Sequence, residues 1–163
     1  MDHQAIAQLL GNYGEFVGAI AVVITLGYLA VQIRQNSESL SANAYQEVTK
    51  AANEWGNLFI DRPAVATLFR RGIDDYFSLD PDERIQFNQI VSTLFRNFAV
   101  ALDLTDRGLV PRGSTPADMY EQSLLSMFTR PGLRDWWKSQ PKSGAKFESH
   151  IDMLLKKATF STN

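Results

Sequence analysis

The chain has 163 residues, of which 45% are hydrophobic, and it contains no cysteine. This length suits one compact domain, and the lack of cysteine excludes disulfide bonds and thiol chemistry. The formal net charge is -2, and all 16 lysines and arginines lie at or after Arg34, as do all but two of the 18 acidic residues. Because nucleic-acid binding needs a basic face, this balance predicts that nucleic acid is not a partner.

Residues 1–15 form the first predicted segment. Apolar side chains recur there at helical spacing, which favours a short helix lying at the membrane interface. The run from Gly11 to Gly14 would allow a bend into the next segment. Because residues 1–15 contain no lysine or arginine, they lack the basic start of a cleaved signal peptide.

Residues 16–34 form the most apolar part of the chain. The stretch from Phe16 to Ile33 contains no charge, with Glu15 before it and Arg34 after it. As a helix it would rise about 27 Å, close to the hydrocarbon thickness of a bilayer. Core helices of soluble proteins rarely run this far without a charge. We therefore predict a transmembrane helix, with the lipid bilayer as a partner.

The basic residues near this span all follow it. Arg34 lies directly after it and Lys50 lies further along, whereas no basic residue precedes it. The positive-inside rule then places the N-terminus outside and residues 35–163, the predicted soluble helical domain, in the cytoplasm.

The helix of the span is expected to continue to about residue 59, because no strong breaker occurs before Arg62–Pro63. Its apolar stripe would either join subunits or cover the core of the soluble domain. Asp61 is a predicted N-cap for the next helix, with Pro63 in its first turn. Asp80 and Glu83 have the spacing of a capping box at the start of a third helix.

The third helix is expected to run to about Asp106 and to stop at Gly108. Further helices are predicted from Thr115–Pro116, from Pro131 to Gln140–Pro141, and around Phe147. No segment shows sustained strand alternation. The predicted fold class is therefore all-α, with one N-terminal transmembrane helix continuing into a long helix, followed by a soluble helical bundle.

Residues 109–114 read LVPRGS, the thrombin recognition sequence that is widely used as an engineered cleavage site. The segment lies in a predicted loop and not at a terminus, where a tag would lie. We interpret it as a candidate engineered site, which would make the length of this loop artificial.

Small residues follow one face of the predicted span. Gly14 and Gly18 form a GxxxG motif, and Ala21 and Thr25 continue the face. Such faces let membrane helices approach closely, so they form a candidate homo-oligomer interface. The alternative is that glycine is simply common in membrane helices.

Glu15 is the single charge between Asp2 and Arg34. A carboxylate inside the membrane would indicate an ion path. A carboxylate at the interface would instead be favoured by the helix dipole in the first turn. In an oligomer, Asn12 and Glu15 would ring the mouth of a pore.

Two further clusters have competing explanations. Acidic residues gather between residues 74 and 83, but their spacing fits no EF-hand loop and helix caps explain three of them, so no metal site is predicted. The segment from Arg130 to Trp137 is a candidate partner surface, because arginine and tryptophan are common in binding hot spots. The residues concerned are Arg130, Arg134, Trp136 and Trp137. Packing of the two tryptophans is the competing explanation.

Signals for an enzyme are nearly absent. His3 and His150 are the two histidines, and no nucleophile elbow, phosphate loop or dinucleotide motif occurs. We predict no catalytic residue, no cofactor and no enzyme activity. A mechanism based on carboxylates stays open, and a deep pocket holding two facing carboxylates would favour it.

Two parts of the chain carry a resemblance to other proteins. One is VGAIAVVITLGYLAVQIRQNSESLSANAYQ (17–46), and the other is YEQSLLSMFTRPGLRDWWKS (120–139) followed by FESHIDMLL (147–155). They resemble a group of uncharacterised bacterial membrane proteins with one N-terminal span and a C-terminal RPG-x-R-x-WW-like element. The resemblance covers most of the chain except 109–114 and implies a bacterial inner membrane. The group has no established activity, so no catalytic residue is carried over.

The sequence therefore predicts a single-pass membrane protein that self-assembles and acts as a scaffold or interaction module through its soluble domain, with an unknown protein partner. The alternative is an oligomeric ion channel or pore lined by the N-terminal membrane helix.

Overall fold

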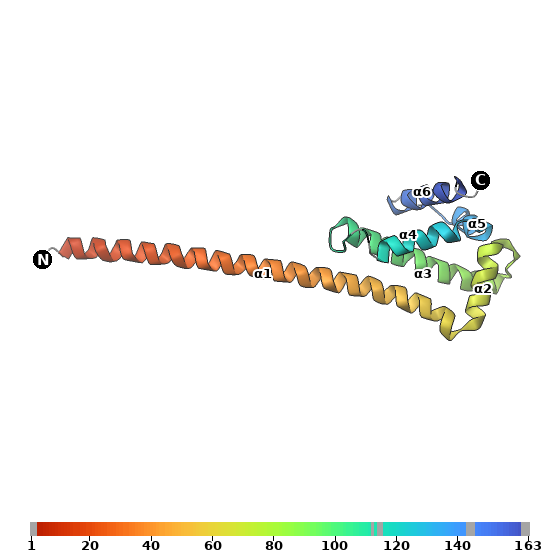
Figure 1. Cartoon of the computed structure of the whole chain (residues 1–163), viewed down its shortest axis with the longest axis horizontal. Helices are drawn as coiled ribbons and strands as arrows, with labels where there is room; N and C mark the ends of the chain where they lie inside the picture. The colour runs from red at the N-terminus through yellow and green to blue at the C-terminus, as the bar shows by residue number, and fades with distance from the viewer. Residues whose placement is uncertain (1–2, 112, 114–115, 143–145, 161–163) are drawn as a thin grey trace. The chain divides into compact units, whose positions relative to one another are not determined.

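The computed structural model describes residues 3–111, 113, 116–142 and 146–160 of the chain, with the backbone alone at 3–11, 116 and 160. These residues form helices and contain no strand, which confirms the all-α fold class. The elements are α1 (His3–Asp61), α2 (Pro63–Asp74), the 3-10 helix η1 (Tyr76–Ser78), α3 (Pro81–Asp106), α4 (Pro116–Met127), α5 (Pro131–Ser139) and α6 (Lys146–Phe160) (Figure 1).

The chain divides into two compact units, Met1–Ser41 and Ala42–Asn163. We call them the N-terminal unit and the helical domain. The division between them falls inside α1. The sequence predicts that the membrane span ends at residue 34. The division into two units does not test where a membrane would end, so this boundary stays a prediction.

The N-terminal unit consists of α1 up to Ser41. α1 begins at His3 and runs without interruption, so the predicted bend at Gly11–Gly14 is wrong. A glycine inside a helix costs about 1 kcal/mol relative to alanine, but it keeps its backbone N–H and therefore its helical hydrogen bond. With no proline nearby, two glycines do not end the helix. Of the predicted interfacial segment 1–15, residues 1 and 2 lie outside the described residues.

The start of α2 also differs from the prediction. Its N-cap is Arg62 and not Asp61, and no side chain caps it. Pro63 occupies the first turn and disfavours helical backbone in the residue before it, so Arg62 adopts φ -136° and ψ 87°. Asp61 is instead the last residue of α1.

Both ends of α3 follow the prediction. Asp80 accepts a hydrogen bond from Glu83 N at 2.9 Å, and Glu83 Oε2 accepts one from Asp80 N at 3.2 Å, which completes a capping box. α3 ends at Asp106, and Gly108 follows with φ +74°, a left-handed conformation that glycine adopts without steric cost.

The core of the helical domain lies between these helices. α4 packs against α3 and α6, and α2 packs against α3 and α5. Aromatic and aliphatic side chains from each layer meet inside. The most completely buried are Phe87, Phe98, Phe128, Leu79, Leu94, Leu124, Leu133, Ile151, Leu154, Val91 and Val110.

The last part of α1 covers this core. Val48 is buried, and the indole nitrogen of Trp55 donates to Ile90 O at 3.0 Å. In the other direction, Asn97 Nδ2 donates to Ala51 O at 3.3 Å. The sequence left open whether the 35–59 stripe joins subunits or covers the core. Its second half covers the core.

The loop between α3 and α4 contains the LVPRGS segment. Val110 is only 1% exposed and its backbone N–H, like that of Leu109, donates to Leu104 O. The first half of the segment is thus part of the packed domain, although Arg112 and Ser114 lie outside the described residues. The engineered origin of 109–114 stays an interpretation.

Candidate functional site

The first candidate site is the apolar surface of α1 in the N-terminal unit. α1 is the one helix of the described residues that is long and apolar enough to cross a membrane, and none of its most apolar 18-residue window is buried in the protein. Large side chains stand exposed all around the helix. They are Tyr13, Phe16, Val17, Ile20, Val22, Val23, Ile24, Leu26, Tyr28, Leu29, Val31 and Ile33. A surface of this kind needs an apolar environment to cover it.

Two polar side chains within this surface form hydrogen bonds inside the helix itself. Thr25 Oγ1 donates to Ala21 O at 2.8 Å, one turn earlier. Gln32 Nε2 donates to Tyr28 Oη at 2.8 Å near the end of the apolar stretch. Hydroxyl groups bonded in this way do not require water, which suits a helix in lipid.

The predicted oligomer interface is open along α1. A Cβ atom added at Gly14 or Gly18 would meet nothing within 4 Å in the described protein. Ala21 and Thr25 follow on the same side, because residues three and four apart share a helix face. This face is therefore free to receive a second helix.

Asn12 and Glu15 are exposed at the start of the apolar stretch. A single helix encloses no path, so these two residues could form a pore mouth only in an assembly of several copies. The polar side resumes after Ile33, where Ser37 Oγ donates to Ile33 O at 3.0 Å and Arg34 pairs with Glu38 at 2.9 Å.

The second candidate site is the RPGLRDWW segment. Arg130, Pro131 and Arg134 each have a structural role in it. Arg130 pairs with Asp74 of α2. Pro131 begins α5. Arg134 Nη1 donates to the carbonyl oxygens of Phe128 and Thr129, at 3.0 and 3.2 Å, and so satisfies groups left open at the end of α4.

The two tryptophans of this segment are buried, with 2% of Trp136 and 7% of Trp137 exposed. The Trp136 indole nitrogen donates to Asn88 Oδ1 at 2.8 Å, and that of Trp137 donates to Asp152 Oδ1 at 2.7 Å. This burial favours the packing explanation for the two tryptophans, and a partner surface formed by Arg130, Arg134, Trp136 and Trp137 stays a prediction. Tryptophan buries a large apolar area and needs one partner for its N–H, and both conditions are met inside the domain.

The acidic residues between 74 and 83 are also engaged in the fold. Asp75 accepts hydrogen bonds from two backbone N–H groups of η1, at 3.1 and 3.2 Å. Glu83 belongs to the capping box and accepts from both terminal nitrogens of Arg71, at 2.6 and 3.0 Å. Helix capping and ion pairing thus explain the positions of these carboxylates.

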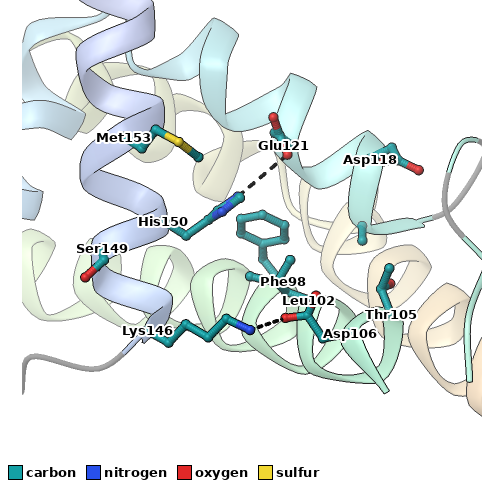
Figure 2. Close-up of a pocket in the computed structure, with 11 residues that line it drawn as sticks. Phe98, Leu102, Thr105, Asp106, Asp118, Glu121, Lys146, Ser149, His150 and Met153 are labelled. Atoms are coloured by element: carbon teal, nitrogen blue, oxygen red, sulfur yellow. Dashed lines mark hydrogen bonds and ion pairs between the residues drawn. The ribbon is translucent and has the colours of Figure 1, made fainter. Parts of the chain in front are cut away.

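A third candidate site is a pocket of about 590 Å³ in the helical domain. It lies between α3, α4 and α6, and Figure 2 shows its lining side chains. Phe98 and Leu102 come from α3, and Met153 comes from α6. The polar lining includes Asp106, Asp118, Glu121, Lys146, Ser149 and His150.

Sequence reasoning missed this pocket. In its lining, Glu121 on α4 lies next to His150 on α6, with 3.6 Å between Glu121 Oε2 and His150 Nε2 (Figure 2). No spacing in the sequence connects the two residues, because the packing of α4 on α6 brings them together. The ring of His150 also lies 5.7 Å from that of Phe98 on α3.

Comparison with known proteins gives no further assignment. No protein-family model, curated protein or solved structure matches this chain. The functional argument therefore depends on the chain's own residues.

Proposed function

We propose that this chain is a single-pass membrane protein in which α1 anchors the helical domain to the bilayer and joins copies of the chain, so that the domain acts as a scaffold or interaction module. The observation that carries the proposal is the exposed apolar surface of α1, whose most apolar 18-residue window has no buried residue. Lipid is the environment that covers such a surface around the whole circumference of one helix.

The ends of the apolar stretch support the same proposal. Glu15 stands at one end, while Arg34 and Glu38 form an exposed ion pair just after the other. Charges at both ends and none between them are typical of a spanning helix. The positions of Arg34 and Lys50 favour an external N-terminus and a cytoplasmic helical domain. A bacterial inner membrane is the proposed location.

Self-association is proposed through the face of Gly14, Gly18, Ala21 and Thr25. Hydrophobicity gives no driving force between helices in lipid, so close backbone packing must supply it. Both glycines leave open space where a partner helix could approach. The helical domain would then be presented in several copies on one side of the membrane.

The experiment is a mass measurement of the full chain in nanodiscs. We compare the wild-type chain with a Gly14→Leu/Gly18→Leu variant and with Gly27→Leu, the same kind of substitution at one position about 180° around the helix from Gly18. Gly27 also has open space around it, so the control tests the face and not the bulk.

We expect a defined oligomer for the wild-type chain and for Gly27→Leu, and a monomer for the double variant. A monomer in all three samples would overturn self-association and would leave a monomeric membrane tether. It would also exclude the pore alternative, because a pore lined by α1 needs several copies.

A further inference from the structure

The pocket between α3, α4 and α6 has the size and composition of a ligand site. Its volume of about 590 Å³ lies within the range of roughly 300–1,000 Å³ that is typical for small-molecule pockets. We propose that it binds a small organic cation, namely a primary ammonium group attached to an apolar body. This inference concerns the helical domain alone and does not depend on the membrane role or on self-association.

One side of the pocket is apolar. Phe98 is fully buried at its floor, and Leu102 and Met153 lie beside it. Apolar lining with a few fixed polar groups is the usual composition of a small-molecule site. An aliphatic or aromatic body would be covered by these side chains.

The charged lining favours a cation over an anion. One ammonium group lines the pocket, and it is already engaged, because Lys146 Nζ lies 2.7 Å from Asp106 Oδ2 (Figure 2). Asp118 lies on α4 one turn before Glu121, so both carboxylates are on the same face of that helix. The Glu121 carboxylate attracts a cationic ligand and repels a carboxylate of the same shape.

Glu121 is the proposed anchor for the ammonium group. Its side chain is 34% exposed, and the Nε2 atom of His150 lies 3.6 Å away, beyond ordinary hydrogen-bond distance. A ligand N–H could therefore reach the carboxylate from the pocket. Asp118 Oδ2 already accepts from Gly113 N at 3.0 Å.

His150 forms the wall beside this carboxylate. Its Nε2 atom is buried and has no hydrogen-bond partner among the described residues. Because this atom is closed off from solvent, it belongs to the wall of the pocket and does not contact a ligand. The side chains do not converge as metal ligands, since the described part of the chain holds no group of three or more His, Asp or Glu suited to a metal ion.

The test uses two ligands of equal shape and opposite charge, phenethylammonium and 3-phenylpropionate. Each is titrated calorimetrically into the full chain in nanodiscs, with empty nanodiscs as the background. We expect saturable binding of phenethylammonium and at least tenfold weaker binding of 3-phenylpropionate. Equal binding of both ions, or no saturable binding of the ammonium, would overturn the proposal.

Two variants locate the binding. Glu121→Gln keeps the shape of the side chain and should weaken ammonium binding at least tenfold, whereas Glu54→Gln makes the same change at a 67% exposed carboxylate outside the pocket and should leave binding unchanged. Met153→Trp should block the pocket without changing its charge. Thermal unfolding of each variant within a few degrees of the wild-type chain establishes that it is folded. Unchanged binding in folded Glu121→Gln and Met153→Trp would overturn the site.

Discussion

Tyr120 is a residue whose hydroxyl group the fold does not use. The side chain is 6% exposed, and its hydroxyl has no hydrogen-bond partner among the described residues. Burial raises the pKa of Tyr120, and the side chain of Asn97 acts in the opposite direction. The Asn97 amide donates to Ala51 O and does not reach hydrogen-bond geometry with the hydroxyl. The hydroxyl therefore stabilises the fold little or not at all.

We predict that Tyr120→Phe raises the free energy of unfolding by about 1 kcal/mol at neutral pH, because it removes a buried group without a partner. Above pH 10 the advantage should grow. The raised pKa means that the unfolded wild-type chain loses this proton first, so its stability falls as pH rises. Thermal unfolding followed by circular dichroism at pH 7.5 and 10.5 measures both effects.

Tyr45→Phe is the control for this prediction, since the side chain of Tyr45 is 42% exposed. It should leave the melting temperature unchanged at both pH values. A loss of more than about 1 kcal/mol in Tyr120→Phe would contradict the account, because it would mean that the hydroxyl makes a stabilising bond in solution.

Single residues near helix ends were predictable where a side chain satisfies the backbone of its own helix. The Asp80–Glu83 capping box and the stop at Gly108 are local features and are both confirmed. The prediction that Asp61 caps α2 was wrong. Pro63 restricts the backbone of Arg62, the residue before it, and this restriction sets the start of α2. The Glu121–His150 pair could not be predicted, since it joins two helices.

At the scale of elements, the crossing of α2 and α5 explains the glycine in the RPGLRDWW segment. A Cβ atom added at Gly132 would collide with Gly72 O and with the backbone of Ile73 and Asp75. Gly72 on the facing helix is equally restricted, because its Cβ would collide with the ring of Phe87. α2 and α5 can therefore approach this closely only with glycine at position 132, while Gly72 lets α2 lie close to Phe87 of α3.

Gly132→Ala should destabilise the helical domain by about 3 kcal/mol, because backbone atoms of α2 must move to accommodate one methyl group. Gly56→Ala makes the same substitution in α1 where nothing lies within 4 Å, and it should leave stability unchanged or raise it by about 1 kcal/mol. Chemical denaturation of the full chain in detergent measures both. A Gly132→Ala chain as stable as Gly56→Ala would contradict the close crossing.

The presence of each helix could be predicted from the sequence, because apolar periodicity and proline positions mark each helix. The continuity of α1 through Gly11 and Gly14 was missed, since glycine lowers helix propensity without breaking the hydrogen-bond pattern. The burial of Trp136 and Trp137 was also open at that stage. Periodicity shows which side chains share a face, but it does not show whether another helix covers that face.

At the scale of the whole molecule, the two units differ in what covers their apolar side chains. The helical domain has a core of large apolar residues that it buries within itself, from Phe87 on α3 to Ile151 on α6. The N-terminal unit leaves its apolar residues exposed around the full circumference of α1. A bilayer around α1 is the proposal that accounts for this difference.

The most direct test is cysteine accessibility in opened membranes, which the chain allows because it contains no cysteine of its own. Single variants Val23→Cys, Thr25→Cys and Asn53→Cys are treated with a membrane-impermeant maleimide before and after solubilisation in dodecyl sulfate. Val23 and Thr25 lie about 200° apart on the helix, so protection of both cannot come from one helix–helix interface.

The account predicts that Asn53→Cys reacts in intact bilayers, while Val23→Cys and Thr25→Cys react only after solubilisation. Labelling of Val23→Cys in the bilayer at the rate of Asn53→Cys would contradict a membrane-spanning α1.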